Sequence, residues 1–521
     1  MKKITALLLI VSMMLCLLSG CADTGDEPYV PTGDALVMEG QDPDSVGPQK
    51  EEDPQEFSLA YYPNRSMNPL LSDDFTNRVI FSLVYQSLFN VNSDYSVEPI
   101  LCSSFKVSTS YRTWTFYIES GVTFSDGTTL TIQDVLATYL AAKESGYYAG
   151  RFTHVLEISL SEDGGITFFL DTPYENLPQL LDIPILKASE VASEAPLGTG
   201  PYMLSDSLAG AQLVRCPLWW CGDVELVVTA QSIPLVEAKD PASIRDHFEF
   251  YDVGLVCADP CSDMYADFRC DYELWDIDNG MFLYLACNTR YTDYLEKTTL
   301  RSMLTYGIDR ETIVRENFRG YAHAVTLPAD PSSPYYSKSL ASRYSYDPGK
   351  FIEFLGTYGK TKEPIRLLVN MDDSVRLRIA HFIADAFTEY GLPMEVKECT
   401  TQKFQQEVFN ADYDLYLGMT KLSANMDLSA FFAPYGNLSR NGVSDEATYS
   451  LCLESLANQG NYYNLHKAVA DDARIIPIAF FGYAVYATRG LMTDLTPTRD
   501  NVFAYSLGKT MDQARIPTDY N

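Results

Sequence analysis

Cysteine and histidine are the residue types of this sequence best suited to metal or nucleophilic chemistry, and their spacing favours neither. Cys257, Cys261 and Cys270 form a C-x3-C-x8-C pattern, whereas structural zinc sites combine tighter pairs with a fourth ligand. Separate or partly paired thiols are the better interpretation. The five histidines are scattered along the chain: His154, His247, His323, His381 and His466. We therefore expect no metal site.

Catalytic signatures are also missing. The chain has no G-x-S-x-G nucleophile elbow, no H-E-x-x-H zinc motif and no G-x-x-x-x-G-K-[ST] phosphate loop, so we expect no enzyme and no cofactor.

The formal net charge of the chain is −32. Nucleic acid is excluded as a partner because its binding needs a basic surface.

The first residues have the pattern of a secretory signal. Lys2 and Lys3 precede an apolar run over residues 6–18, which is too short to span a bilayer of about 30 Å. Residues 18–21 (LSGC) resemble a bacterial lipobox, in which the cysteine is acylated and becomes the new N-terminus. We expect a signal peptide over 1–20 and a lipid on Cys21; ordinary secretion is the alternative.

Residues 21–56 are predicted to form an acidic disordered tether. After Cys21 they contain eleven Asp or Glu, one Lys and five Pro, so they bury too little apolar surface to offset the entropy of ordering.

Nine further cysteines lie beyond the tether, and because this number is odd they cannot all pair with one another. Cys216 with Cys221 and Cys257 with Cys261 are close enough to pair, but spacing leaves the connectivity open.

Apolar patterning begins at Phe57 and alternates between helical and strand periods. Residues 72–89 show apolar positions three and four apart, residues 113–118 alternate, and Asp126-Gly127 marks a turn before a capping-box-like helix start at Thr131. Further segments read as buried strands (282–286, 365–369, 475–481) or as helices (300–317, 379–390). The fold class is mixed α/β, with a boundary in the proline-rich stretch 172–202.

In this order the segments resemble the oligopeptide, dipeptide and nickel-binding family (family 5) of ABC-transporter substrate-binding proteins. The resemblance runs from about Phe57 to about Gly490, and its most specific part is TWTFYI at 113–118, GVTF at 121–124 and SDGTTLT at 125–131. Other matching blocks are NPL at 68–70, VYQSLF at 84–89, EPIL at 98–101, PLGTGPY at 196–202, LWW at 218–220, LRSML at 300–304, YGIDR at 306–310 and YDP at 346–348.

The resemblance implies a two-lobed periplasmic-binding-protein-like fold (class II) of three structural domains with an interlobe ligand cleft. We expect a discontinuous lobe I, an inserted middle domain and lobe II. The predicted ranges are 57–92, 192–275 and 485–521 for lobe I, 93–191 for the middle domain and 276–484 for lobe II.

The resemblance also points to a pocket wall at Thr420, Lys421, Leu422 and Asp427. Peptide-binding relatives often place an aspartate in this stretch to pair with the ligand's amino terminus, whereas this sequence has Ser423 or Ala424 there. A buried ammonium without a counter-charge is costly, so a free-amine peptide needs another partner. Further wall residues are predicted, each of which could equally belong to the core: Tyr147, Tyr148, Trp275, Met281, Tyr284, Phe481 and Tyr483.

We therefore expect a monomeric, lipid-anchored solute-binding protein on the outer face of the bacterial cytoplasmic membrane. It would bind a peptide or peptide-like ligand by hinge closure and deliver it to an ABC permease and ATPase. A non-peptide solute, such as a nickel chelate or oligosaccharide, and a sensory surface protein that retains the fold remain alternatives.

Overall fold

The computed structural model describes residues 57–517 apart from 73, 209, 223, 260–267, 291–293, 360, 362 and 440–441. The described residues belong to one compact unit. Cys21, the predicted signal peptide and the tether lie outside the described residues. No helix in the described part of the chain is long and apolar enough to cross a membrane.

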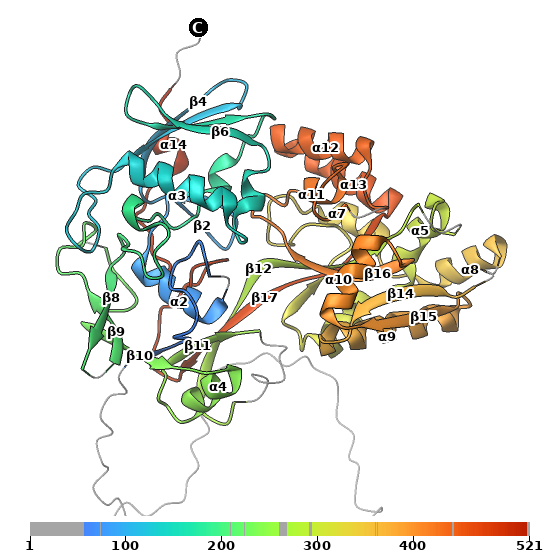
Figure 1. Cartoon of the computed structure of the whole chain (residues 1–521). Coiled ribbons are helices and arrows are strands. Elements are labelled where there is room, and N and C mark those ends of the chain that lie inside the picture. The colour runs from blue at the N-terminus through green and yellow to red at the C-terminus, as the bar shows by residue number, and fades with distance from the viewer. Residues whose placement is uncertain are drawn as a thin grey trace, which may run out of the picture. The chain divides into compact units, whose positions relative to one another are not determined.

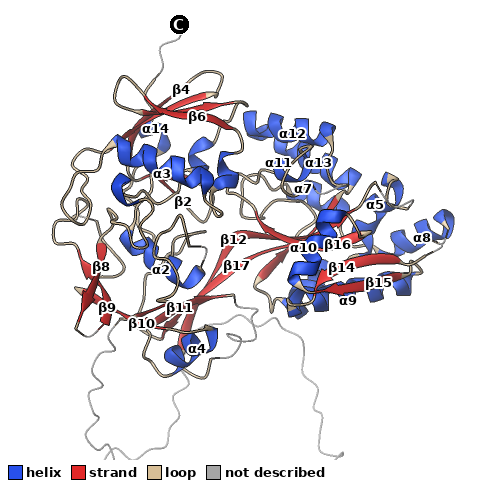
Figure 2. Ribbon diagram, viewed as in Figure 1, coloured by secondary structure: helices blue, strands red, loops and turns tan. Residues whose placement is uncertain are grey.

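The largest sheet has eleven strands, and it combines both lobes (Figures 1 and 2). In spatial order it contains β15 (Met394–Cys399), β14 (Ile365–Asn370), β16 (Leu415–Lys421), β12 (Tyr272–Cys287), β17 (Ile475–Thr488), β11 (Leu255–Ala258), β1 (Leu59–Tyr61), β10 (Ser232–Glu237), β9 (Gly210–Arg215) and β8 (Tyr202–Ser207), with β13 (Ala322–Ala324) beside β17. The long strands β12 and β17 are central. They pair with each other from Tyr272 to Ala286 of β12.

The middle domain has its own four-stranded sheet, separate from the large one. Its order is β4 (Cys102–Val107), β5 (Thr113–Ile118), β7 (Ile166–Leu170) and β6 (Val155–Leu160). Alternation in β5 buries Trp114 and Phe116. Helix α3 (Ile132–Glu144) covers this sheet and begins as predicted, because the Asp134 carboxylate accepts the backbone N–H of Thr131 at 2.8 Å.

The remaining elements surround these two sheets. They are α2 (Phe75–Val84), β2 (Phe89–Val91), β3 (Val97–Pro99), α4 (Pro241–Glu249), α5 (Thr298–Leu304), α6 (Arg310–Asn317), α7 (Lys338–Ala341), α8 (Pro348–Tyr358), α9 (Ser374–Tyr390), α10 (Thr401–Asn410), α11 (Ser429–Phe432), α12 (Glu446–Ala457), α13 (Tyr462–Asp472), α14 (Met511–Ala514) and short 3-10 turns. Helices α9 and α10 pack on β14 and β15. The mixed α/β class is confirmed.

The first predicted helix is shorter than expected. The helix predicted over 72–89 ends at Val84, whose carbonyl accepts the N–H of Gly200 at 2.9 Å. A Cβ on Gly198 would lie 2.1 Å from the same oxygen, so the glycine-rich segment packs directly against this helix end.

The single helix predicted over 300–317 is wrong. The chain breaks it into α5, a 3-10 turn at Thr305–Gly307 and α6. Asp309 caps α6 by accepting the N–H of Thr312 at 3.0 Å, and this competes with continuation of the first helix. The buried Arg310 side chain then donates to the carbonyl of Pro477 at 2.7 Å, which fixes α6 against β17.

We call the three predicted parts lobe I, the middle domain and lobe II. The positions 275/276 and 484/485 fall inside β12 and β17, the two strands that continue from lobe I into lobe II. The exact domain boundaries remain predictions.

Candidate functional site

An irregularity interrupts the pairing of β12 with β17 where the two strands pass between the lobes. The register shifts between Asp278 and Met281, and Gly280 has φ +80°. A Cβ on Gly482 would lie 1.6 Å from the carbonyl oxygen of Ile277. Glycine is therefore required at this crossing, and bulges of this kind bend strands locally.

A cavity with a volume of about 260 Å³ lies beside this irregularity. Lobe I contributes Phe75 of α2 and Asp259 after β11. Lobe II contributes the other lining residues: Asn279, Met281, Leu283, Phe318, Asp373, Val375, Arg376, Met419, Phe481, Gly482 and Tyr483. We call this space the interlobe cavity. A solute held in it contacts both lobes.

The interlobe cavity is mostly apolar and has few charged groups. Arg376, in the first turn of α9, directs Nε to Asp373 Oδ2 at 2.7 Å. Within the described residues, no hydrogen bond involves its two terminal guanidinium nitrogens. An arginine fork of this kind suits bidentate binding of a carboxylate. Apolar walls with a few charged groups, here Asp259, Asp373 and Arg376, are typical of small-molecule sites.

Three of the predicted site residues meet at the interlobe cavity. Met281, Phe481 and Tyr483 all line it. The Tyr483 ring packs edge-on against Phe75 with 4.6 Å between ring centroids, and its hydroxyl donates to the carbonyl of Thr498 at 2.7 Å. Burial raises the pKa of Tyr483, so this hydroxyl stays protonated and acts as a donor.

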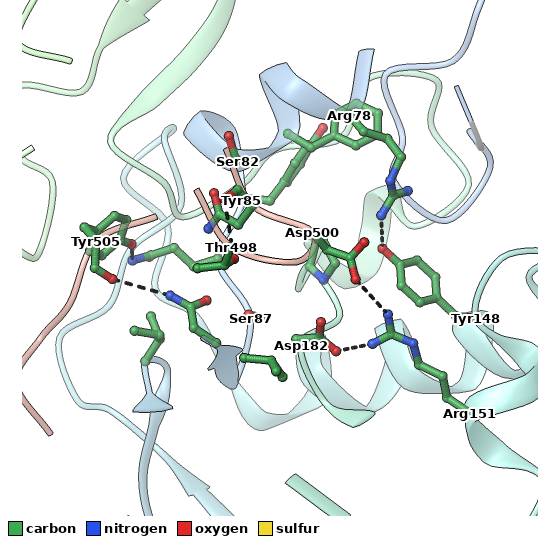
Figure 3. Close-up of a pocket in the computed structure, with 17 residues that line it drawn as sticks. Arg78, Ser82, Tyr85, Ser87, Tyr148, Arg151, Asp182, Thr498, Asp500 and Tyr505 are labelled. Carbon is green, nitrogen blue, oxygen red and sulfur yellow. Dashed lines mark hydrogen bonds and ion pairs between the residues drawn. The ribbon is translucent and has the colours of Figure 1, made fainter. Parts of the chain in front are cut away.

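Three others, Tyr147, Tyr148 and Lys421, belong to a separate charged cluster around Asp500 (Figure 3 shows Tyr148 and Asp500). Lys421 forms an ion pair with Asp500 and donates to the Tyr147 hydroxyl at 3.2 Å. Arg78 donates to the Tyr148 hydroxyl at 2.7 Å and stacks 3.9 Å from the Tyr147 ring centroid. The cluster joins lobe I, the middle domain and lobe II.

The carboxylate of Asp500 is the centre of this cluster. Burial alone would raise its pKa, but the neighbouring charges of Lys421, Arg499 and Arg151 outweigh burial and hold the pKa well below the ordinary value. Arg151 also pairs with Asp182. The pocket in Figure 3 has a volume of about 60 Å³, which is room for roughly two waters at about 30 Å³ each and not for a peptide.

The other predicted site residues do not line the interlobe cavity. Thr420 pairs with Phe282 in the sheet, and Leu422 donates its N–H to the carbonyl of Gly280 at 2.9 Å. Tyr284 is 2% exposed and packs edge-on against Phe431 in the core. Trp275 packs against the lobe I core, and Asp427 accepts the N–H of Ser429 at 2.8 Å. Ligand contacts for all eleven predicted residues remain predictions.

Several lining residues escaped the sequence prediction, above all Arg376 and Phe75. Arg376 carried one usable signal: a cation in the first turn of a helix opposes the macrodipole, which favours acidic residues there. Phe75 had none, since an aromatic residue on an apolar helix face is normally core.

The middle domain and lobe II also contact each other directly. The Tyr95 hydroxyl donates to Asp330 Oδ2 at 2.8 Å, and the Tyr335 hydroxyl donates to Gln179 Oε1 at 2.8 Å. Asn176 Nδ2 donates to the same Tyr335 hydroxyl at 3.0 Å. Because buried polar groups need hydrogen-bond partners, these bonds fix how the middle domain packs against lobe II.

Comparison with models of protein families assigns the chain to a family. The model described as "Bacterial extracellular solute-binding proteins, family 5 Middle" matches residues 96–442, more than half of the chain. The chain belongs to this family. Its members have the two-lobed fold, and the predicted fold class and family are confirmed.

Individual family members are distant in sequence. The glutathione-binding protein GsiB of Shigella boydii is 22% identical over 347 residues, which cover 64% of this chain and 67% of that protein. Proteins of the same name from Salmonella align over 59% of their own length, less than two thirds.

Solved structures agree over most of the chain. The substrate-binding protein CtaP of Listeria monocytogenes has a TM-score of 0.71 at 19% identity, covering 86% of this chain and 97% of CtaP. The oligopeptide-binding protein AppA of Bacillus subtilis, solved with a nonapeptide, has a TM-score of 0.62 at 17% identity, covering 87% of this chain and 99% of AppA. At these identities the likeness establishes the fold.

Proposed function

We propose that this protein captures a short peptide or peptide-like solute in the interlobe cavity and delivers it to an ABC permease and ATPase. The observation that carries the proposal is the lining of that cavity: Phe75 comes from one lobe, and Met419 and Phe481 come from the other. A solute in contact with both lobes stabilises the closed arrangement by its differential affinity for it.

The chemistry of the cavity favours a small amphipathic zwitterion, because the lining carries two carboxylates, Asp259 and Asp373, beside the cation of Arg376. Its apolar walls suit a hydrophobic side chain, and the Arg376 fork suits a carboxylate such as the carboxyl terminus of a peptide. The volume of about 260 Å³ lies just below the range of roughly 300–1,000 Å³ for ligand sites, so a di- or tripeptide fits better than a nonapeptide. The relative named for glutathione, itself a small peptide, supports this size class.

Native mass spectrometry of the purified protein, before and after partial unfolding and refolding to remove bound material, tests this proposal. We expect co-purified peptides, and a rise in melting temperature when di- and tripeptides are added back. A response confined to nickel chelates or oligosaccharides would replace the peptide assignment while keeping solute binding. No response to any of these solutes would leave a sensory surface protein as the better interpretation.

Lipid attachment at Cys21 forms the second part of the proposal. A lipid-anchored, extracytoplasmic position would keep the protein beside its permease, with the acidic residues of 21–56 as a tether. Fractionation of cells expressing the parent and Cys21→Ala proteins tests it. We expect the parent in the membrane fraction and the variant released or retained with its signal peptide; identical lipid-free products would contradict the anchor.

A further inference from the structure

We propose that a second cavity, between the middle domain and lobe II, binds a small aromatic cation. This cavity has a volume of about 480 Å³, larger than the interlobe cavity, and shares no lining residue with it. Strands and loops of the middle domain form most of its wall, α14 and Arg515 of lobe I add to it, and Pro334 and Gln459 of lobe II complete it. Its volume lies within the range of roughly 300–1,000 Å³ that small-molecule sites occupy.

The wall of this second cavity is aromatic. Phe105 of β4 and Trp114 of β5 lie with ring centroids 5.6 Å apart, and Tyr111 lies 6.2 Å from Trp114. The indole N–H of Trp114 donates to the carbonyl of Tyr174 at 3.1 Å, which fixes the ring and satisfies its only donor. Such faces attract flat rings, and they attract cations through the ring quadrupole.

The charged residues of the lining decide the sign of the ligand. Asp94, Glu175 and Asp512 contribute three carboxylates, whereas Arg515 is the single lysine or arginine among the lining residues. The whole chain carries a net charge of −32, so the surrounding potential also attracts cations. An aromatic ring that carries an ammonium group satisfies both the aromatic wall and the acidic lining.

The position of Glu175 links this cavity to both sides of the interface. Its Oε2 accepts the backbone N–H of Gln459 at 3.3 Å, and its own N–H donates to the carbonyl of Leu456 at 2.9 Å. A cation beside this carboxylate therefore contacts the middle domain and lobe II together. The site is independent of the solute proposed for the interlobe cavity.

Isothermal titration of the purified protein with tryptamine tests the proposal, with indole-3-acetate as the probe of the same ring system and opposite charge. We expect saturable binding of tryptamine and none of indole-3-acetate. Glu175→Gln keeps the acceptor for Gln459 but removes the charge, so tryptamine affinity should fall about fivefold, the effect of roughly 1 kcal/mol. The exposed Glu162→Gln variant should bind tryptamine as the parent does.

Three results would overturn the proposal. A binding free energy of about 4 kcal/mol corresponds to a Kd of about 1 mM. If tryptamine shows no saturable binding up to about 10 mM, the cavity holds only water. Equal binding of indole-3-acetate would remove the cation preference. Unchanged tryptamine affinity in Glu175→Gln, together with competition between tryptamine and a co-purified peptide, would place the ligand in the interlobe cavity instead.

Discussion

Lys421, the last residue of β16 in lobe II, forms an ion pair with Asp500 of the C-terminal segment in lobe I. Their side chains are 25% and 16% exposed, so the pair is largely shielded from solvent. Asp500 also lies 3.9 Å from an Arg151 nitrogen of the middle domain. One carboxylate thus balances cations from two other parts of the molecule.

Removal of the Asp500 charge should destabilise the protein. Asp500→Asn leaves the Lys421 ammonium without its counter-charge, and loss of one partner of a shielded pair costs about 3 kcal/mol. Urea unfolding measures the change. Lys467→Met is the matched control because its pair with Asp471 is about half exposed on both sides, and a change of under about 0.5 kcal/mol is expected. Equal effects of both variants would contradict a role for burial.

Arg376 should contribute to solute affinity through its charge. If its guanidinium holds a carboxylate of the ligand, Arg376→Met should weaken peptide binding roughly tenfold to a hundredfold, the effect of about 1.5–3 kcal/mol for a hydrogen bond to a charged group. Isothermal titration with a co-purified peptide measures it. Arg378→Met, exposed two residues along the same helix, should bind as the parent does, and unchanged affinity in Arg376→Met would exclude this contact.

Gly482 should tolerate no side chain. Gly482→Ala places a methyl group on the carbonyl of Ile277, so β12 and β17 must separate and the interlobe cavity must change shape. We expect loss of about 2 kcal/mol or more in the free energy of unfolding, together with weaker solute binding. Gly356→Ala in α8, where a Cβ meets nothing within 4 Å, should be neutral or stabilising by up to about 1 kcal/mol.

The Tyr335 hydroxyl should help to hold the middle domain against lobe II. Tyr335→Phe leaves Gln179 Oε1 without this donor and Asn176 Nδ2 without this acceptor, at a cost of about 1–3 kcal/mol. Small-angle scattering without solute should show a larger radius of gyration in the variant. Tyr435→Phe, at a side chain 98% exposed, should leave the scattering curve unchanged.

His466 should make stability depend on pH. It is fully buried, neither ring nitrogen has a hydrogen-bond partner among the described residues, and burial lowers its pKa to about 3. The folded state therefore binds fewer protons than the unfolded state between the folded value and the ordinary value near 6.5. Its contribution to stability is complete above about pH 6.5 and is lost as the pH falls toward 3.

The size of this effect follows from the same linkage. Between about pH 7.5 and 4.5 the free energy of unfolding should fall by about 2–3 kcal/mol because of His466. Urea unfolding at several pH values measures it, and His466→Met should flatten the curve in this range. Near-UV circular dichroism at neutral pH checks that the variant is folded; an unchanged slope in a folded variant would refute the assignment.

Local patterns determined the elements of this protein and their order. The alternation of 113–118, the capping box at Thr131 and the glycine turn at Asp126-Gly127 depend on neighbours a few residues away, so the sequence contains the information directly. The break at Ile308-Asp309 was missed because the apolar period continues across it. A tertiary contact, the bond from Arg310 to Pro477, helps to fix the break.

The family, and with it the two-lobed fold, could also be predicted from the order of the sequence blocks. Of the predicted site residues, Met281, Phe481 and Tyr483 line the interlobe cavity, Tyr284 lies in the core and Lys421 pairs with Asp500. Ligand contacts for all of them remain predictions. Tertiary structure alone brought Phe75 beside Tyr483 and placed Arg376 in the cavity lining. Residues hundreds of positions apart meet there because two long strands cross between the lobes, and no local pattern encodes which side chains converge at such a crossing.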